Sequence, residues 1–374
     1  MTKRKTYKED RSGWPLFNRI LADYIELTRF PELPESPKSG KNYEYWPDGA
    51  LCANGNPYHG CIRLGSSNKL MIGFSGGGVS VDEYTAARPQ RIGGKGEMFY
   101  SDDVRFGDII PRIGTFGRSK KNPFRDWNLL FVPYATGDFH CGTGDFSYTD
   151  LNGEPAVLHH HGYTNFQMLL TKIKELVPSP DQILVTGFSA GAFATSLLTD
   201  AVAAAFPKCR DITACVDSAM MHCDWQRVAR DVWKAPKEIT DRLNGTEIVT
   251  DSLLALHEKR PDIKILYCCS ARDAALTQME TYLENGRWIP DRDDGIRFQE
   301  KLKEMLDLLQ KSIPDMSIFI FDTPDKNSKA SGLTVHCLCG SGAAFTTVSD
   351  GVTCSDWMIR GVNGEVLKLG LEKL

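Results

Sequence analysis

The pentapeptide Gly187–Gly191 (GFSAG) constrains the fold of this chain more than any other stretch, because it fits the pattern Gly-x-Ser-x-Gly. An apolar, β-prone run at 183–186 precedes it, and a run of small, helix-forming residues at 192–206 follows it. A serine between such a strand and such a helix lies on a sharp turn, and glycines two positions to either side leave room for that turn. The context therefore predicts an exposed nucleophile at Ser189. The alternative is a chance match in a glycine-rich connection.

Composition narrows the class of protein. The chain has 374 residues, enough for one large α/β domain or for two domains, and its hydrophobic fraction of 41% is that of a globular protein. A net charge of −4 offers no basic surface for nucleic acid. No apolar run approaches the roughly 18 residues of a membrane span, and no apolar signal-peptide core follows the charged stretch Met1–Asp10. We therefore expect no nucleic-acid partner, no membrane partner and a cytoplasmic location. Secretion is the alternative if a leader has been removed. The oligomeric state is left open.

The eleven cysteines form no metal-finger pattern. Cys268 and Cys269 are adjacent within an apolar run that predicts a buried strand, and buried cysteine behaves as a small hydrophobic residue. Most of the cysteines are therefore expected to be free thiols of a reduced compartment, with one or two disulfides left open.

Two early strands lead into a glycine-rich loop. The runs Tyr58–Leu64 and Lys69–Phe74 are typical of strands, and the second continues directly into Ser75–Gly78. Three successive glycines after a buried strand are costly in chain entropy. We therefore interpret the loop as one that presents backbone N–H groups to an oxyanion, together with the N–H of Ala190. The alternative is a flexible turn.

The middle of the chain supplies pocket candidates and a run of three histidines. The strand predicted at 127–134 ends in a loop that holds Asp138 and His140, and parallel sheets bind ligands at the carboxyl ends of their strands. A capping aspartate and a surface histidine are the alternative. His159–His161 are expected at the start of a helix over 163–176, where adjacent side chains point in different directions. No metal site is therefore predicted, and chelation should leave activity unchanged.

Three further strands are predicted after the nucleophile, at 212–218, 263–269 and 316–321, with a long helix at 293–311 before the last of them. The charged segment 225–260 has a helical pattern. It forms either a lid or pocket wall, or a solvated helical excursion. Three histidines follow the nucleophile in the chain: His222, His257 and His336.

Counting strands selects the partners of Ser189. In α/β-hydrolases the order along the chain is serine, acid, histidine; the acid usually follows the second strand after the nucleophile and the histidine follows the third. This rule selects Asp273 and His336. Asp217 follows the first strand, one too early, and Asp322 at the end of the third is the chief rival as the acid.

An ordered set of motifs resembles the pectinacetylesterase and Notum family. The motifs are Asn54–Tyr58, Gly76–Gly78, the segment 127–144, His160–Gln167 and Gly187–Ala192. Asp273, with Gln278 downstream, and His336 occupy the places of the family's acid and histidine, and the similarity spans roughly residues 50–340. Val79 and Ser80 stand where the family usually has Trp and Cys, which argues against pectin itself as the substrate.

The resemblance implies a cofactor-independent serine esterase or deacylase that removes an acetyl or other short acyl group from a small-molecule or carbohydrate ester. Its oxyanion hole would lie at Gly77, Gly78, Val79 and Ala190. We expect a single α/β-hydrolase-like domain over residues 46–374, with a mostly parallel central sheet, flanking helices and insertions, after an N-terminal extension at 1–45. The alternatives are a thioesterase, an amidase or a longer-chain deacylase with the same residues, and a non-catalytic binding protein on this fold.

Overall fold

The computed structural model describes residues 27–90, 96–104, 107–245, 247–328 and 332–374. Most of the N-terminal extension expected at 1–45 therefore lies outside the described residues. Its last four residues form the first edge strand of the central sheet.

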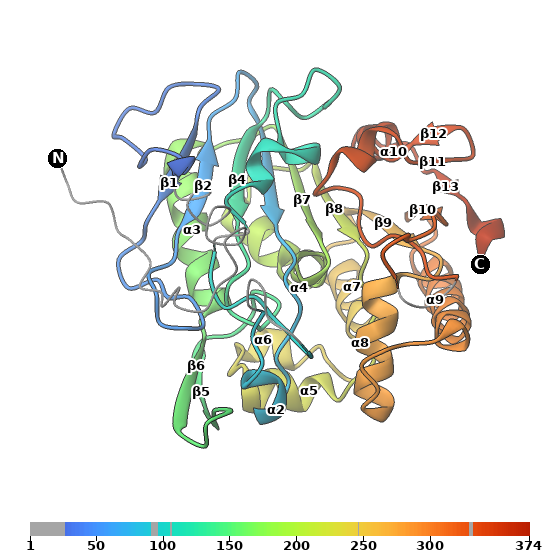
Figure 1. The fold of residues 1–374 in the computed structure, drawn as a ribbon. Helices are drawn as coiled ribbons and strands as arrows, with labels where there is room; N and C mark the ends of the chain where they lie inside the picture. The colour runs from blue at the N-terminus through green and yellow to red at the C-terminus, as the bar shows by residue number, and fades with distance from the viewer. Residues whose placement is uncertain (1–26, 91–95, 105–106, 246, 329–331) are drawn as a thin grey trace.

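A nine-stranded sheet runs through the centre of the described molecule (Figure 1). Its strands lie in the order β1-β2-β4-β3-β7-β8-β9-β10-β13. The pairs β1–β2 and β2–β4 are antiparallel and the other pairs are parallel, which confirms the predicted mostly parallel sheet. The strands have these bounds: β1 Asn42–Tyr45, β2 Gly60–Arg63, β3 Lys69–Phe74, β4 Asn128–Val132, β7 Gln182–Phe188, β8 Ile212–Asp217, β9 Lys264–Ser270, β10 Ser317–Phe321 and β13 Lys368–Leu369.

Helices cover both faces of the sheet (Figure 1). The α-helices of the described residues are α2 Glu83–Ala86, α3 Gly162–Leu176, α4 Ala190–Ala205, α5 Trp225–Arg227, α6 Lys237–Thr240, α7 Ile248–Lys259, α8 Ala274–Asn285, α9 Arg292–Ser312 and α10 Cys354–Val362. None of them is long and apolar enough to cross a membrane.

The central strands are buried on both sides, as a parallel sheet between helices requires. Successive side chains of β3 and β7 point to opposite faces. Ile72 and Val185 are paired in register and join the larger core, beneath α3, α4, α7 and α9. Met71 and Leu184 are also paired and join a smaller core beneath α10.

The structure differs from the prediction at the histidine run. His159 and His160 do not begin a helix; they end strand β6 (Pro155–His160), which pairs antiparallel with β5 (Gly144–Thr149) in a separate hairpin. The prediction was wrong because the turn at Asp150–Gly153 allows 155–160 to pair locally with the segment before it. His161 alone precedes α3.

The segment 225–260 packs into the body of the protein in its described part. Trp225 and Trp233 are fully buried and contact Phe139, and Trp233 donates a hydrogen bond to the carbonyl of Ser80 at 2.8 Å. Helix α7 at the end of the segment packs against α4. This arrangement does not fit a solvated excursion.

Candidate active site

Ser189 lies on a strained turn between β7 and α4, with φ 55° and ψ −128°. A Cβ atom on Gly187 or Gly191 would collide with backbone carbonyl groups, and one on Gly76 would lie 2.5 Å from the Cβ of Ser189. The glycines therefore let the turn form and let the loop after β3 approach it closely. This is the strand–turn–helix geometry that the sequence pattern predicts, although Ser189 itself is half-buried rather than exposed.

Asp273 and His336 form a hydrogen-bonded pair beside this turn. The Nδ1 of His336 lies 2.8 Å from Oδ2 of Asp273. The other oxygen of Asp273 accepts hydrogen bonds from the backbone N–H groups of Ala275 and Leu276, at 3.1 and 3.0 Å, and so caps helix α8. Asp322 is exposed and has no hydrogen bond to His336, so the geometry favours Asp273 over its rival as the partner of the histidine.

The second nitrogen of His336 is available for chemistry. Its Nε2 is buried and has no hydrogen-bond partner within the described residues. Burial of the imidazole lowers its pKa, but the charge of Asp273 and the hydrogen bond to it have the opposite effect, and the pKa is raised from the ordinary value of 6.5. A raised pKa makes His336 a stronger base once it is neutral.

Asp217 anchors the loop that carries His336. Its Oδ2 accepts hydrogen bonds from the backbone N–H groups of Leu338 at 2.9 Å and Cys339 at 2.7 Å, and the side chain is fully buried. Burial raises the pKa of Asp217, although these hydrogen bonds oppose the rise. Strand counting rejects Asp217 as the acid and overlooks this role. An aspartate at the end of the buried strand β8 was the available signal.

Three of the four backbone groups predicted for an oxyanion hole are open. The N–H groups of Gly77, Gly78 and Ala190 have no acceptor among the described residues. The N–H of Val79 donates to the carbonyl of Phe99 at 2.8 Å. Including Val79 in the hole is therefore wrong, because an antiparallel bridge next to the glycines already uses its N–H.

Ser189 and His336 line one cavity of about 220 Å³, which we call the inner cavity. Gly77, Gly78 and Ala190 also line it. The rest of its wall is mainly apolar and includes Phe99, Phe139, Phe193, Met221, Leu276 and Met279.

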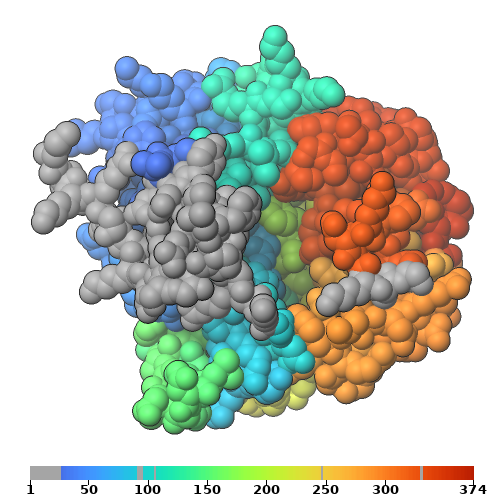
Figure 2. Space-filling model, in the orientation of Figure 1, coloured from blue at the N-terminus to red at the C-terminus, as the bar shows by residue number. Residues whose placement is uncertain are grey.

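A second cavity of about 460 Å³, the outer cavity, adjoins the first. It shares Ala275, Gln278, Trp288 and His336 with the inner cavity, and adds the polar side chains of Asp325 and Asn327. Figure 2 shows a hollow on this face between the cyan and orange parts of the surface, the parts of the chain that contribute these walls.

Asp138 and His140 do not line either cavity. Asp138 is fully buried and accepts four hydrogen bonds, from the hydroxyl of Thr136 and from three backbone N–H groups. Burial lowers the pKa of His140 to about 4. Asp138 and His140 fix the conformation of their loop. Phe139, the residue between them, therefore lies in the wall of the inner cavity.

Metal-ligating atoms converge at two places in the described residues, neither of which lines the cavities. One group is Asp145, His159 and His161, and the other is Glu44, His59 and Asp108. Arg29 and Trp46 donate hydrogen bonds to Glu44 in the second group.

Comparison with known proteins gives the family. The model of the pectinacetylesterase family matches residues 44–237, just over half of the 374 residues. The match includes Ser189 and ends before Asp273 and His336. No curated protein matches the sequence.

A solved structure, the Wnt deacylase Notum from Drosophila, is similar to this chain with a TM-score of 0.57. The match covers 88% of this chain and 97% of that chain, at 14% sequence identity. At this identity the likeness establishes the fold, which is α/β-hydrolase-like. The chain therefore belongs to the pectinacetylesterase family and is a carboxylic ester hydrolase.

Proposed function

We propose that the protein is a serine esterase or deacylase that works through an acyl-enzyme on Ser189. The observation that carries the proposal is the Asp273–His336 hydrogen bond, which leaves the Nε2 of His336 free in the cavity that Ser189 also lines. Ser189 and His336 are not hydrogen-bonded in this state, and such bonds often tighten only when substrate is bound.

The reaction follows from these positions. His336 takes the hydroxyl proton of Ser189 as the oxygen attacks the ester carbonyl, and Asp273 stabilises the imidazolium that forms. The open N–H groups of the oxyanion loop and of Ala190 donate hydrogen bonds to the negative oxygen. His336 then gives its proton to the departing alcohol, and water, activated by the same histidine, releases the acid and restores Ser189.

The two cavities indicate how the substrate lies. The alcohol must leave beside His336, which protonates it, and the outer cavity, which His336 lines together with the polar side chains of Asp325 and Asn327, is on that side. The acyl group then occupies the apolar inner cavity. Its volume of about 220 Å³ is below the roughly 300 Å³ where small-molecule pockets begin. This arrangement supports a short acyl group on a polar alcohol such as a carbohydrate.

A longer-chain deacylase is the second candidate, and the wall of the inner cavity favours it in one respect. Met221 and Met279 are unbranched and adapt their shape, so the cavity has flexible walls. Hydrolysis of p-nitrophenyl esters from acetate to decanoate distinguishes the two. A kcat/KM that falls steadily beyond butyrate supports the short-acyl proposal, and a maximum at octanoate or longer contradicts it.

Replacing Ser189 with Ala tests the central claim. The substitution removes only the hydroxyl of a half-buried side chain that lines the inner cavity, so we expect hydrolysis to fall on the order of a thousandfold or more with little change in melting temperature. Labelling by a fluorophosphonate should be lost in the same variant. Near-normal hydrolysis or labelling in a pure preparation would eliminate Ser189 as the nucleophile, and wild-type protein that is never labelled would favour a binding protein.

A further inference from the structure

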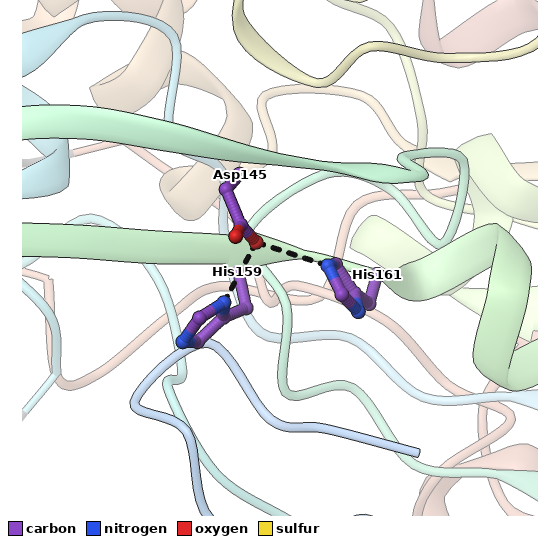
Figure 3. Close-up of side chains that lie close together, drawn as sticks. All are labelled: Asp145, His159 and His161. Carbon is purple, nitrogen blue, oxygen red and sulfur yellow. Dashed lines mark hydrogen bonds and ion pairs between the residues drawn. The ribbon is translucent and has the colours of Figure 1, made fainter. Parts of the chain in front are cut away.

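The side chains of Asp145, His159 and His161 converge on one point at the base of the β5–β6 hairpin (Figure 3). The Oδ1 atom of Asp145 lies 2.7 Å from Nδ1 of His159 and 3.0 Å from Nε2 of His161. One oxygen atom is therefore shared by two imidazoles that come from different positions in the chain.

Strand geometry produces this convergence. Asp145 and His159 are direct partners across the hairpin. His159 and His161 are two residues apart, so their side chains lie on the same side of the chain, whereas His160 points the other way. His160 is buried and bonds the carbonyl of Thr136 at 2.7 Å, as this alternation requires.

The three side chains have the composition of a metal site. Two imidazoles and a carboxylate suit first-row divalent ions, with ligand distances of about 2.0–2.2 Å to zinc. Two ligands of a tetrahedral ion at that distance lie roughly 3.3 Å apart, so the present 2.7 and 3.0 Å separations need to open by about 0.6 and 0.3 Å.

The site is also accessible, and among the described residues no lysine or arginine forms an ion pair with its carboxylate. The side chains of His159 and His161 are 24% and 22% exposed, and that of Asp145 is 54% exposed, so an ion and its waters can reach them. The ion pairs recorded for Asp145 in the described residues are those with the two histidines. Partial burial raises the pKa of this carboxyl, but the two histidine hydrogen bonds outweigh burial and keep the pKa below its usual value.

We propose that Asp145, His159 and His161 bind a divalent transition-metal ion, with water in the remaining coordination positions. The ion ties β5 to the end of β6 and to the first residue before α3, and so stabilises the hairpin against the body of the protein. None of the three residues lines the inner or outer cavity. The role is therefore structural, and chelation is still expected to leave ester hydrolysis unchanged.

Zinc binding to the full chain tests this proposal, after metal has been removed with a chelator. Titration calorimetry should show one ion per chain, and the melting temperature should rise with zinc. Asp145→Asn and His161→Ala should each weaken zinc binding about tenfold or more and remove the rise in melting temperature. Asp150→Asn is the matched control, because it makes the same change in the turn of the same hairpin, and it should bind zinc as the wild type does.

The proposal fails if the wild type shows no saturable zinc binding, or if Asp145→Asn binds as tightly as the wild type. Binding through cysteine would also overturn it. Cobalt separates that case, because thiolate ligands give an intense near-ultraviolet charge-transfer band that imidazole and carboxylate ligands do not give. Ser189→Ala should bind zinc normally, so this result is independent of the proposed esterase mechanism.

Discussion

Asp273 uses its two carboxylate oxygens for different tasks. Oδ1 caps helix α8 and Oδ2 holds Nδ1 of His336. The cap fixes the carboxylate, and the carboxylate in turn fixes the ring, so the direction of Nε2 is set by the start of a helix. A substitution that keeps the helix cap and changes only Oδ2 tests the proposed catalytic role of Asp273, which is to orient His336.

Asp273→Asn makes that change. Its amide oxygen can keep the cap while the NH₂ group faces Nδ1, which favours the wrong tautomer of His336, and such a change costs about ten-thousandfold in a well-studied triad. We expect a loss of that order in kcat with an almost unchanged melting temperature. Asp322→Asn, at the exposed rival, is the matched control and should retain most of the activity. The reverse result would mean that Asp322 reaches the histidine during catalysis.

The pH dependence of hydrolysis follows from the raised pKa of His336. The base must be neutral, so kcat/KM should fall as the pH is lowered through a value above 6.5, and Asp273→Asn should move this limb to lower pH. The effect on stability has the opposite sign. A pKa raised by folding stabilises the protein at pH below the unfolded value, and that stabilisation disappears as the pH rises through the folded value.

His222 is the control for this profile, because the pKa of His222 is also raised: the hydrogen bond and charge of Glu280 outweigh the effect of burial. His222→Gln should leave the acid limb in place. Burial lowers the pKa of His140 to about 4 and that of His160 to about 3, so neither contributes near neutrality. An acid limb that vanishes in His222→Gln would contradict the assignment to His336.

At the scale of elements, the loop after β10 depends on the end of β8. Asp217→Ala would leave two buried N–H groups, those of Leu338 and Cys339, without acceptors, at about 1–3 kcal/mol each. We expect a lower melting temperature and a kcat that falls more than KM changes, because the loop places His336.

Asp211→Ala, just before the other end of β8, is the comparison for this variant. Asp211 bonds Gln182 and Lys264, far along the strand from the cavity, so its loss should reduce stability but leave kcat nearly unchanged. If both variants reduce kcat in proportion to their stability, Asp217 is not a positioning residue.

Some elements were predictable because their signals are local. The predicted strand at 69–74 coincides with β3, and the helix expected after Ser189 coincides closely with α4. The β5–β6 hairpin was missed although β5 alternates polar residues with Phe146 and Tyr148, because the two short strands are defined by their pairing with each other and belong to no larger sheet.

In the candidate site, too, some features were predictable from the sequence and others depend on contacts between distant residues. Chain order places Asp273 and His336 after successive parallel strands, and the structure brings the two side chains into contact. The N–H of Val79 was misassigned because its acceptor, Phe99, lies on a distant loop. The aspartate at the end of the buried strand β8 signals that Asp217 needs partners, but those partners lie more than a hundred positions away and no spacing in the sequence identifies them.

At the scale of the whole molecule, the eleven cysteines are free and nine of them are buried. Titration with a thiol reagent should therefore detect at most two thiols in the native protein, Cys223 and Cys337, and all eleven in denaturant. The physical reason is that a buried thiol cannot meet the reagent and that burial raises its pKa, as in Cys268. Fewer than eleven thiols in denaturant, restored by a reductant, would reveal disulfides.

From β7 to β10 the order of strands in the sheet is also their order in the chain. Asp217 ends one of these four neighbouring strands, and Ser189, Asp273 and His336 follow the other three, so the four residues align only after β10 has joined the sheet. Helices form from local contacts, whereas parallel strands must first close long connections and pair slowly. During refolding, esterase activity therefore requires that β10 has paired with the sheet. We expect the activity to return later than the helical signal in circular dichroism.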